Sequence, residues 1–221
     1  MISLIIPVHN ATECVINLIE NLKNTEARDY DIIFVDDASE LDTHKVLVEY
    51  ASEFPNVQIL KNTKQQLFTR TLNRGIRAAQ PNTEYFICIN TDCELSPGWL
   101  NSLIAVMEFD KSCAICGYPD GVPENKPLEK IGVPNYITGH CICIRRKALE
   151  ELGVFCETDH QQAHIASERI WCWKALNNNW TSYYVHNPLC LHRKDGPSWG
   201  RDINWLWNFN YSQLWEGRDT L

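Results

Sequence analysis

Short apolar segments alternate with helix-like segments through the first half of the chain, and this alternation limits the fold more than any other feature. The apolar segments are Ile2–Val8, Asp31–Val35, Val57–Leu60 and Tyr85–Ile89. The segments with a helical apolar period run from Asn10 to about Lys23, Leu41 to Ser52, Leu67 to Ala79 and Ser96 to about Phe109. Apolar strands separated by helices are typical of a mostly parallel sheet covered on both faces. The sequence therefore predicts the α/β class, with helices on both sides of a central sheet.

Polar residues and a proline mark the predicted starts of these helices. Asn10, followed by Glu13 three residues later, fits a capping box for the first helix. Ser39 fits the N-cap of the second helix. Pro97 fits the first position of the fourth helix, where the N–H that proline lacks would have no partner anyway.

The second half of the chain is less regular. We expect strands at Ala114–Tyr118, Tyr136–Ile144 and Thr181–Val185, and helices at Arg146–Leu152 and Ser167–Asn177. The segments Pro119–Asn135 and Gly153–Ala166 are expected to be loops, and a loop as long as the second often forms a lid over an active site.

The length of 221 residues suits one α/β domain with a short appendage. We expect residues 1–197 to form the domain. Residues 198–221 contain four tryptophans, Trp199, Trp205, Trp207 and Trp215. This aromatic-rich segment is expected to be helical and to pack on the domain or on a partner.

Charge and cysteine content narrow the class of protein. The formal net charge of -8 disfavours nucleic acid as a partner, because duplex DNA requires a basic face. The sequence shows no signal peptide and no run long enough for a membrane helix, so we expect a cytoplasmic protein, with peripheral membrane contact left open. The ten cysteines then fit reduced thiols. Cys113 with Cys116 and Cys141 with Cys143 lie in apolar segments, which favours buried thiols over a zinc site.

Ligands of open α/β sheets bind beyond the carboxyl ends of the strands. This rule places His9-Asn10, Asp36-Asp37 and Asn90–Glu94 along one rim of the predicted sheet. The turn Asp36-Asp37-Ala38-Ser39 has two interpretations of equal weight. Its carboxylates can accept from ribose hydroxyls or a base N–H, or they can simply shape a polar turn in front of a helix.

Two segments carry candidate ligands for a divalent metal. Asp92 is the first candidate and Glu94 the second, because Mg²⁺ and Mn²⁺ prefer hard oxygen ligands and also bind substrate phosphates. His192 offers an imidazole, which suits Mn²⁺. Each segment by itself is also explained by an acidic turn or a structural histidine.

Glu168 lies at the start of the predicted helix Ser167–Asn177. A carboxylate at this position complements the helix dipole. It can also take a proton from an attacking hydroxyl, as a general base. Both interpretations stay open on these residues alone.

Six pieces of the sequence, taken in order, resemble the family-2 inverting glycosyltransferases, which have the GT-A fold. They are Ser3–Asn10, Ile33–Ser39, Leu72–Ile76, Ile89–Leu100, Gly139–Arg146, and finally Glu168 followed by His192. The resemblance spans about residues 2 to 192, with Asn90-Thr91-Asp92 in place of the commoner Asp-x-Asp. Two departures stand out: Asn62–Gln66 lacks the glycine that is common before the third helix, and Ser167-Glu168 replaces the common Glu-Asp.

The resemblance implies a metal-dependent transfer of a sugar from a UDP- or dTDP-linked donor to an acceptor hydroxyl, with inversion. It implies Mn²⁺ or Mg²⁺ on Asp92 and His192, and Glu168 as the base toward a glycan, lipid-linked or protein acceptor. The nucleotide site it implies consists of Pro7, His9, Asn10, Asp37, Arg70, Arg74, Asn90 and Thr91. Further candidates for contacts with the diphosphate or the acceptor are Glu94, His140, Lys194 and Arg201.

Two alternatives remain beside this interpretation. The departure at Ser167 and the short length also fit a catalytically weak nucleotide-sugar-binding domain of a larger glycosyltransferase. A nucleotidyltransferase shares the sheet and the metal, but its usual Gly-rich basic loop is not found at His9–Glu13. A register error at Glu168 would place the base at Asp159 or Glu157 instead.

Overall fold

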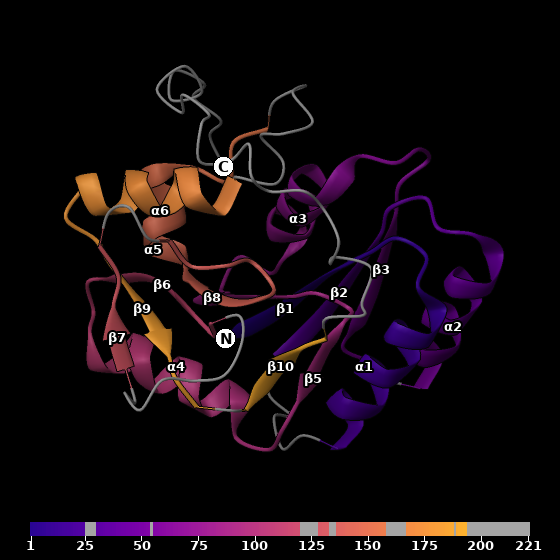
Figure 1. Ribbon diagram of the computed structural model, residues 1–221. Helices are drawn as coiled ribbons and strands as arrows, with labels where there is room; N and C mark the ends of the chain where they lie inside the picture. The colour runs from indigo at the N-terminus through magenta and orange to yellow at the C-terminus, as the bar shows by residue number, and fades with distance from the viewer. Residues whose placement is uncertain are drawn as a thin grey trace.

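The computed structural model describes residues 1–24, 30–53, 55–119, 128–132, 136–157, 167–187 and 189–193 (Figure 1). Its strands are β1 (Ile2–Val8), β2 (Tyr30–Asp36), β3 (Val57–Lys61), β4 (Tyr85–Ile89), β5 (Cys93–Leu95), β6 (Cys113–Gly117), β7 (Leu128–Lys130), β8 (Cys141–Arg145), β9 (Thr181–Val185) and β10 (Cys190–His192). Within these residues, one sheet has the strand order β3-β2-β1-β4-β8-β6-β9-β7, and β5 and β10 form a separate two-stranded ribbon.

The first half of the sheet is parallel and the second half is mixed. Parallel pairs join β2 to β3, β1 to β2 and β1 to β4. The direction reverses at β8, which is antiparallel to both β4 and β6, while β6 and β9 are again parallel. The α/β class is therefore confirmed, and the carboxyl ends of β1, β2 and β4 lie at one edge.

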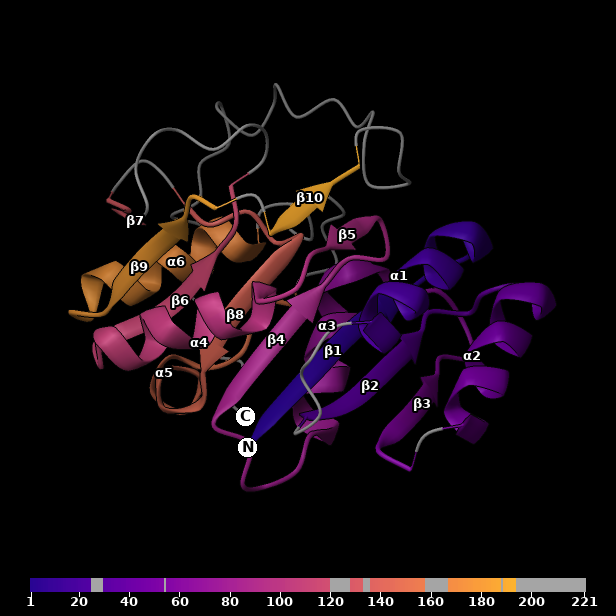
Figure 2. The ribbon, with the colours of Figure 1, turned by 90° about the horizontal axis from the view of Figure 1, so that it is seen from below.

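Helices cover both faces of the sheet, as expected. The helices α1 (Thr12–Asn24), α2 (Leu41–Glu53) and α4 (Trp99–Phe109) lie on one face, and α3 (Leu67–Ala78), α5 (Arg146–Leu152) and α6 (Ser167–Asn177) lie on the other (Figures 1 and 2). Successive side chains of β1 point to opposite faces of the sheet. Leu4 and Ile6 therefore pack with the first group of helices, and Ile5 packs with the second.

Short elements account for most differences between the predicted and observed structure. The strands β5, β7 and β10 have three residues each and were not predicted, because three residues carry too little periodicity. The strand predicted from Tyr136 begins only at Cys141. Residues 136–140 form a loop in which the Tyr184 hydroxyl donates to the Tyr136 carbonyl and accepts from the Thr138 N–H.

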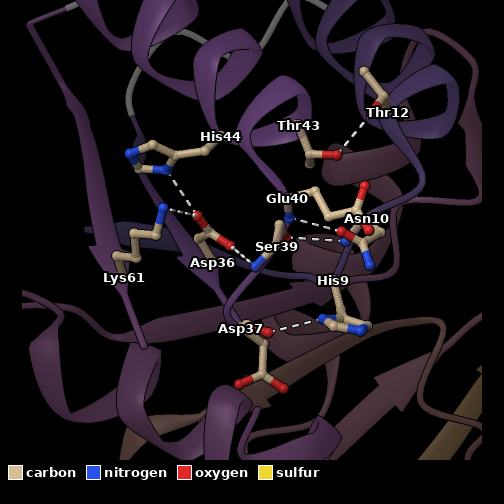
Figure 3. Close-up of polar contacts among 10 residues, drawn as sticks. All are labelled: His9, Asn10, Thr12, Asp36, Asp37, Ser39, Glu40, Thr43, His44 and Lys61. Carbon is tan, nitrogen blue, oxygen red and sulfur yellow. Dashed lines mark hydrogen bonds and ion pairs between the residues drawn. The ribbon is translucent and has the colours of Figure 1, made fainter. Parts of the chain in front are cut away.

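The predicted helix caps at Asn10 and Ser39 are wrong. The Asn10 side-chain oxygen accepts from the N–H of Glu40, 2.8 Å away, at the start of α2 rather than α1. The N–H of Asn10 in turn donates to Ser39 Oγ at 2.9 Å (Figure 3). These two bonds tie the chain after β1 to the chain after β2, a long-range pairing that local sequence spacing does not reveal.

The predicted start of the fourth helix is also wrong. Pro97 precedes α4, and the N-cap position belongs to Gly98, whose φ is 86°. This backbone region favours glycine, because a side chain there is strained. The left-handed residue therefore sets the start of the helix two residues after the proline.

Asn73 joins α3 to the segment that follows α5. Its side chain is fully buried and bonds both main-chain groups of Phe155: Nδ2 donates to the carbonyl at 2.7 Å, and Oδ1 accepts from the N–H at 3.2 Å. The same Nδ2 donates to Glu157 Oε1 at 2.8 Å. One amide group thus fixes the segment that carries Glu157.

Removing this amide is expected to destabilise the fold. Asn73→Ala would leave a buried N–H and a buried carbonyl of Phe155 unpaired, each at a cost of about 1–3 kcal/mol. We expect the free energy of unfolding, measured by urea denaturation, to fall by roughly 2–6 kcal/mol. Asn24→Ala is the control, because Asn24 makes an exposed bond to Glu20 on the surface of α1. Equal losses in both variants would contradict this role for Asn73.

Candidate active site

The candidate site lies at the carboxyl edge of the parallel half of the sheet. Here β1 ends at Val8, β2 at Asp36 and β4 at Ile89. Because β1 separates β2 from β4 and neighbouring strands lie about 4.8 Å apart, the ends of β2 and β4 are roughly 10 Å from each other. The rim predicted from the sequence is therefore present as a continuous edge.

Asp36 is a structural residue of this edge. Its side chain is fully buried, and Oδ1 accepts from the N–H of Ser39 at 2.8 Å. Oδ2 accepts from His44 Nδ1 at 2.7 Å and lies 3.8 Å from Lys61 Nζ (Figure 3). For Asp36, the polar-turn interpretation is therefore the correct one.

The Asp37 side chain points away from that network (Figure 3), and it bonds the start of α3. Its Oδ1 accepts from Asn62 Nδ2 at 2.6 Å and from the Gln66 N–H at 2.7 Å, and its Oδ2 accepts from the Leu67 N–H at 2.9 Å. The negative charge complements the helix N-terminus. A carboxylate has about four acceptor positions, so among the described residues one position on Oδ2 is left for a ligand.

The rest of the predicted nucleotide-binding edge surrounds Asp37. The His9 ring donates from Nδ1 to the Asp37 carbonyl at 2.8 Å, while Asn10 bonds the start of α2 as described above. Pro7 lies half-buried in β1, opposite Val35. At the end of β4, Thr91 is buried and the N–H of Asn90 donates to the His140 carbonyl at 2.7 Å.

A cationic cavity of about 400 Å³ lies next to Asp37. Arg70 and Arg74, both predicted from the sequence, line it together from α3. Arg74 also donates to Asn62 Oδ1, and Asn62 in turn bonds Asp37, so the cavity and Asp37 share one network. The complete lining is Lys61, Asn62, Thr63, Gln66, Arg70, Arg74 and Glu157. Three cations against one carboxylate suit an anionic ligand.

Sequence reasoning missed Lys61 and Asn62 as members of this cavity. Both follow from the rule used for the other strands, because they stand at the carboxyl end of β3. Glu157 was considered only as a substitute base. Its Oε1 accepts from Arg77 at 2.7 Å and from Asn73, which gives it a role in fixing α3.

Asp92 and His192, predicted as metal ligands, lie side by side. The ribbon of β5 and β10 pairs His192 with Cys93, the neighbour of Asp92. The N–H of Arg193 donates to the Asp92 carbonyl at 2.9 Å. As a result, His192 Nε2 lies 3.3 Å from Asp92 Oδ1, and both side chains are largely buried.

This pair fits a divalent ion that also binds phosphate. Two neighbouring ligands of an octahedral ion at about 2.0–2.1 Å are roughly 3 Å apart, close to the separation of Oδ1 and Nε2. Within the part of the chain that the structure describes, no group of three histidine, cysteine or carboxylate side chains is placed to hold a metal. An ion on Asp92 and His192 would take its remaining ligands from water and substrate phosphates, as Mg²⁺ commonly does.

Glu94 lies outside this pair. It alternates with the inward-facing Cys93 and Leu95 on β5 and is exposed, with Arg193 Nε 3.8 Å from its Oε1. Glu94, the second candidate metal ligand, therefore does not point toward the Asp92–His192 pair in this arrangement. Lys194, Arg201, Asp159 and the segment 198–221 lie outside the described residues.

Glu168, the predicted base, is buried at the start of α6. Only 7% of the residue is exposed, and its carboxylate packs on Gly139, where an added Cβ would overlap Oε1. The Ser167 hydroxyl donates to Oε2 at 3.2 Å. Burial, opposed by hydrogen bonds from its own N–H and from Ser167, raises the pKa of Glu168 to about 7. A carboxyl with this pKa is suited to exchange protons near neutral pH.

The cysteines pack as small apolar side chains. All ten are thiols rather than disulfides, and all except Cys14 and Cys156 are buried. The segments around Cys116 and Cys141 belong to one core cluster, and burial raises the pKa of both thiols. The expectation of buried thiols is confirmed.

The fold is the GT-A fold that the family resemblance implies. The mannosyltransferase PcManGT from Pyrobaculum calidifontis, solved in complex with GDP-Man and Mn²⁺, aligns with a TM-score of 0.73 and 16% sequence identity. The alignment covers 90% of this chain and 58% of that one. In the part of the chain that the structure describes, every helix is too short or too polar to cross a membrane.

Sequence comparison identifies the family. The model of glycosyl transferase family 2 matches residues 3–136, which is more than half of the chain. The chain belongs to glycosyl transferase family 2.

The related proteins found by sequence comparison are much longer than the segment that matches this chain. Polypeptide N-acetylgalactosaminyltransferase 5 of Caenorhabditis elegans is 31% identical over 97 residues, which are 43% of this chain and 15% of that protein. Polypeptide N-acetylgalactosaminyltransferase 10 of Mus musculus is 28% identical over 118 residues, 52% of this chain and 19% of that protein. The matched segment thus spans less than a fifth of the length of these relatives.

Proposed function

We propose that this chain binds a nucleotide sugar with a divalent ion and transfers the sugar to an acceptor hydroxyl. The observation that carries the proposal is the Asp92–His192 pair, with Nε2 and Oδ1 3.3 Å apart at the end of β4. The same sheet edge holds Asp37 and opens to the cationic cavity lined by Arg70 and Arg74. Neither feature alone distinguishes a glycosyltransferase, but their combination matches the needs of a nucleoside diphosphate.

Different residues bind different parts of the nucleotide-sugar donor. The nucleoside lies near Asp37 and His9, where one carboxylate position accepts an N–H or a hydroxyl. Arg70, Arg74 and Lys61 attract the phosphates by charge. Asp92 and His192 hold Mn²⁺ or Mg²⁺, which when bound neutralises negative charge on the departing diphosphate.

Glu168 acts on the acceptor. Its carboxylate, deprotonated above about pH 7, takes the proton of the attacking hydroxyl. Attack from the face opposite the diphosphate inverts the anomeric centre. The acceptor is a hydroxyl of a glycan, a lipid-linked sugar or a protein.

Release of nucleoside diphosphate from a panel of donors tests this function. UDP-, dTDP- and GDP-linked sugars are incubated with the protein and Mn²⁺, Mg²⁺ or EDTA. We expect release from a UDP- or dTDP-sugar that requires the ion, and a product of inverted configuration by ¹H NMR. Absence of release with every donor, despite tight binding of one nucleotide, would instead support the catalytically weak binding domain. Retained configuration would contradict the direct attack assisted by Glu168.

Gly139→Ala is expected to impair transfer more than it weakens donor binding. The added methyl group would overlap Glu168 Oε1 and displace the carboxylate. Misplacement of a catalytic group by about 1 Å can cost on the order of 10²-fold in rate. Turnover and nucleotide affinity are measured on the same preparation.

Gly132→Ala is the matched control, because a Cβ at Gly132 would have no atom within 4 Å among the described residues. It should leave turnover unchanged. A Gly139→Ala protein with the turnover of this control would contradict the position of Glu168 in the site.

A further inference from the structure

The ring of His140 lies flat against the ring of His192. Their centroids are 4.6 Å apart and their planes differ by 4°. His140 is buried, with 2% of the residue exposed, and its Nδ1 is hydrogen-bonded to Thr138 Oγ1 at 3.2 Å. The loop of residues 138–140 therefore fixes one face of the His192 imidazole.

The main chain of His140 supports the other half of the metal pair. Its carbonyl accepts from the N–H of Asn90 at 2.7 Å and from the Cys93 thiol at 3.2 Å. These two residues flank the Thr91-Asp92 turn. A single residue thus contacts both the segment that carries Asp92 and the ring of His192.

The stacked arrangement differs from that of two ligands of one ion. Ligand lone pairs must converge on the metal, whereas parallel stacked rings direct theirs side by side. The hydrogen bond between Nδ1 of His140 and Thr138 fixes the orientation of the His140 ring. His192, in contrast, directs Nε2 toward Asp92 Oδ1. His140 is therefore placed to orient a ligand rather than to be one.

We propose that His140 is a positioning residue, whose ring stacks on His192 and holds Nε2 toward Asp92 before the ion binds. This inference rests on the proposed metal site and adds a residue to it. His192 stands on a strand of only three residues. A flat ring packed against it reduces the number of rotamers it can adopt. Groups that orient a metal ligand typically contribute 10–100-fold to metal affinity.

Mn²⁺ affinity of three variants tests this role. Binding is measured by electron paramagnetic resonance and calorimetry, with and without UDP, on wild type, His140→Ala and His140→Phe. His140→Ala should weaken Mn²⁺ binding by about 10–100-fold. His140→Phe keeps a flat ring without ligand nitrogens and should restore most of the affinity. His186→Ala is the control, because it removes another largely buried imidazole, paired with Glu129, and should leave Mn²⁺ binding unchanged.

The outcomes separate this inference from the function it rests on. Wild-type affinity in His140→Ala, while wild type binds Mn²⁺, overturns the positioning role alone. Loss of binding in both His140→Ala and a folded His140→Phe overturns it as well, because the nitrogens rather than the stack would then be needed. If wild type binds no Mn²⁺, both the metal site and this inference are wrong. Should His140→Ala fail to fold, His140→Phe still decides between stacking and ligation.

Discussion

Glu168→Gln is expected to lower sugar transfer by about 10²–10⁴-fold, the usual contribution of a general base. Glutamine keeps the size of the side chain but cannot take a proton. Donor and metal affinity should stay unchanged, because Glu168 contacts Gly139 and Ser167 rather than the Asp92–His192 pair. Turnover and nucleotide affinity, measured together, separate these effects.

The same substitution is expected to stabilise the folded chain at alkaline pH. Because the folded-state pKa of Glu168 is raised from 4.5 to about 7, the folded state holds this proton more tightly than the unfolded state. Stability therefore falls as pH rises from about 4.5 to 7, and the loss is complete above that range. Removing the charge at pH 8 should raise the free energy of unfolding by on the order of 3 kcal/mol. The gain should vanish near pH 4.

The pH dependence of turnover gives a second check. Wild-type turnover should fall as pH drops below about 7, where Glu168 becomes protonated, and the residual rate of Glu168→Gln should lack this fall. Glu13→Gln is the control, since Glu13 is an exposed carboxylate in the first turn of α1. A Glu168→Gln protein with normal turnover and reduced stability would show that Glu168 only complements its helix. Asp159 would then be the next candidate base.

Asp92→Asn is expected to abolish metal-dependent binding of the nucleoside diphosphate. The change removes the carboxylate charge that faces His192 Nε2, so Mn²⁺ affinity should fall beyond the 10–100-fold typical of residues that merely support a ligand. His192→Ala should have a smaller effect, because the charged ligand is retained. Calorimetric titration of UDP in the presence of Mn²⁺ measures both losses.

Glu94→Gln provides the control for Asp92→Asn. Glu94 is a neighbouring carboxylate on the exposed side of β5, with Arg193 as its partner. It should leave nucleotide affinity unchanged. Equal losses for Asp92→Asn and Glu94→Gln would show a general effect of acidic charge and would remove Asp92 from the metal site.

The parallel half of the fold is predictable because its signals are local and long enough. The buried strands β1 (Ile2–Val8) and β4 (Tyr85–Ile89) have the predicted bounds. The three-residue strands β5 and β10 have no such signal, and they form only because each pairs with the other. This ribbon is nevertheless the element that brings His192 to Asp92.

The sequence predicts which residues form the candidate site better than it predicts the role of each residue. The resemblance indicated Asp92, His192 and Glu168, and the structure brings the first two together. The roles of Asp36 and Asp37 differ because the Asp36 side chain turns toward His44 and the Asp37 side chain toward α3. The sequence shows only two adjacent aspartates, so it does not reveal this difference. The packing of Glu168 on Gly139 depends on contact between distant segments, as does the stack of His140 on His192.

The most direct test of the metal-dependent nucleotide site is the anomalous diffraction of Mn²⁺ in a crystal grown with UDP. The expected result is an anomalous peak within coordination distance of both Asp92 Oδ1 and His192 Nε2, with UDP along the edge from Asp37 to Asp92. A peak elsewhere, or nucleotide bound at this edge without any ion near Asp92, would contradict it.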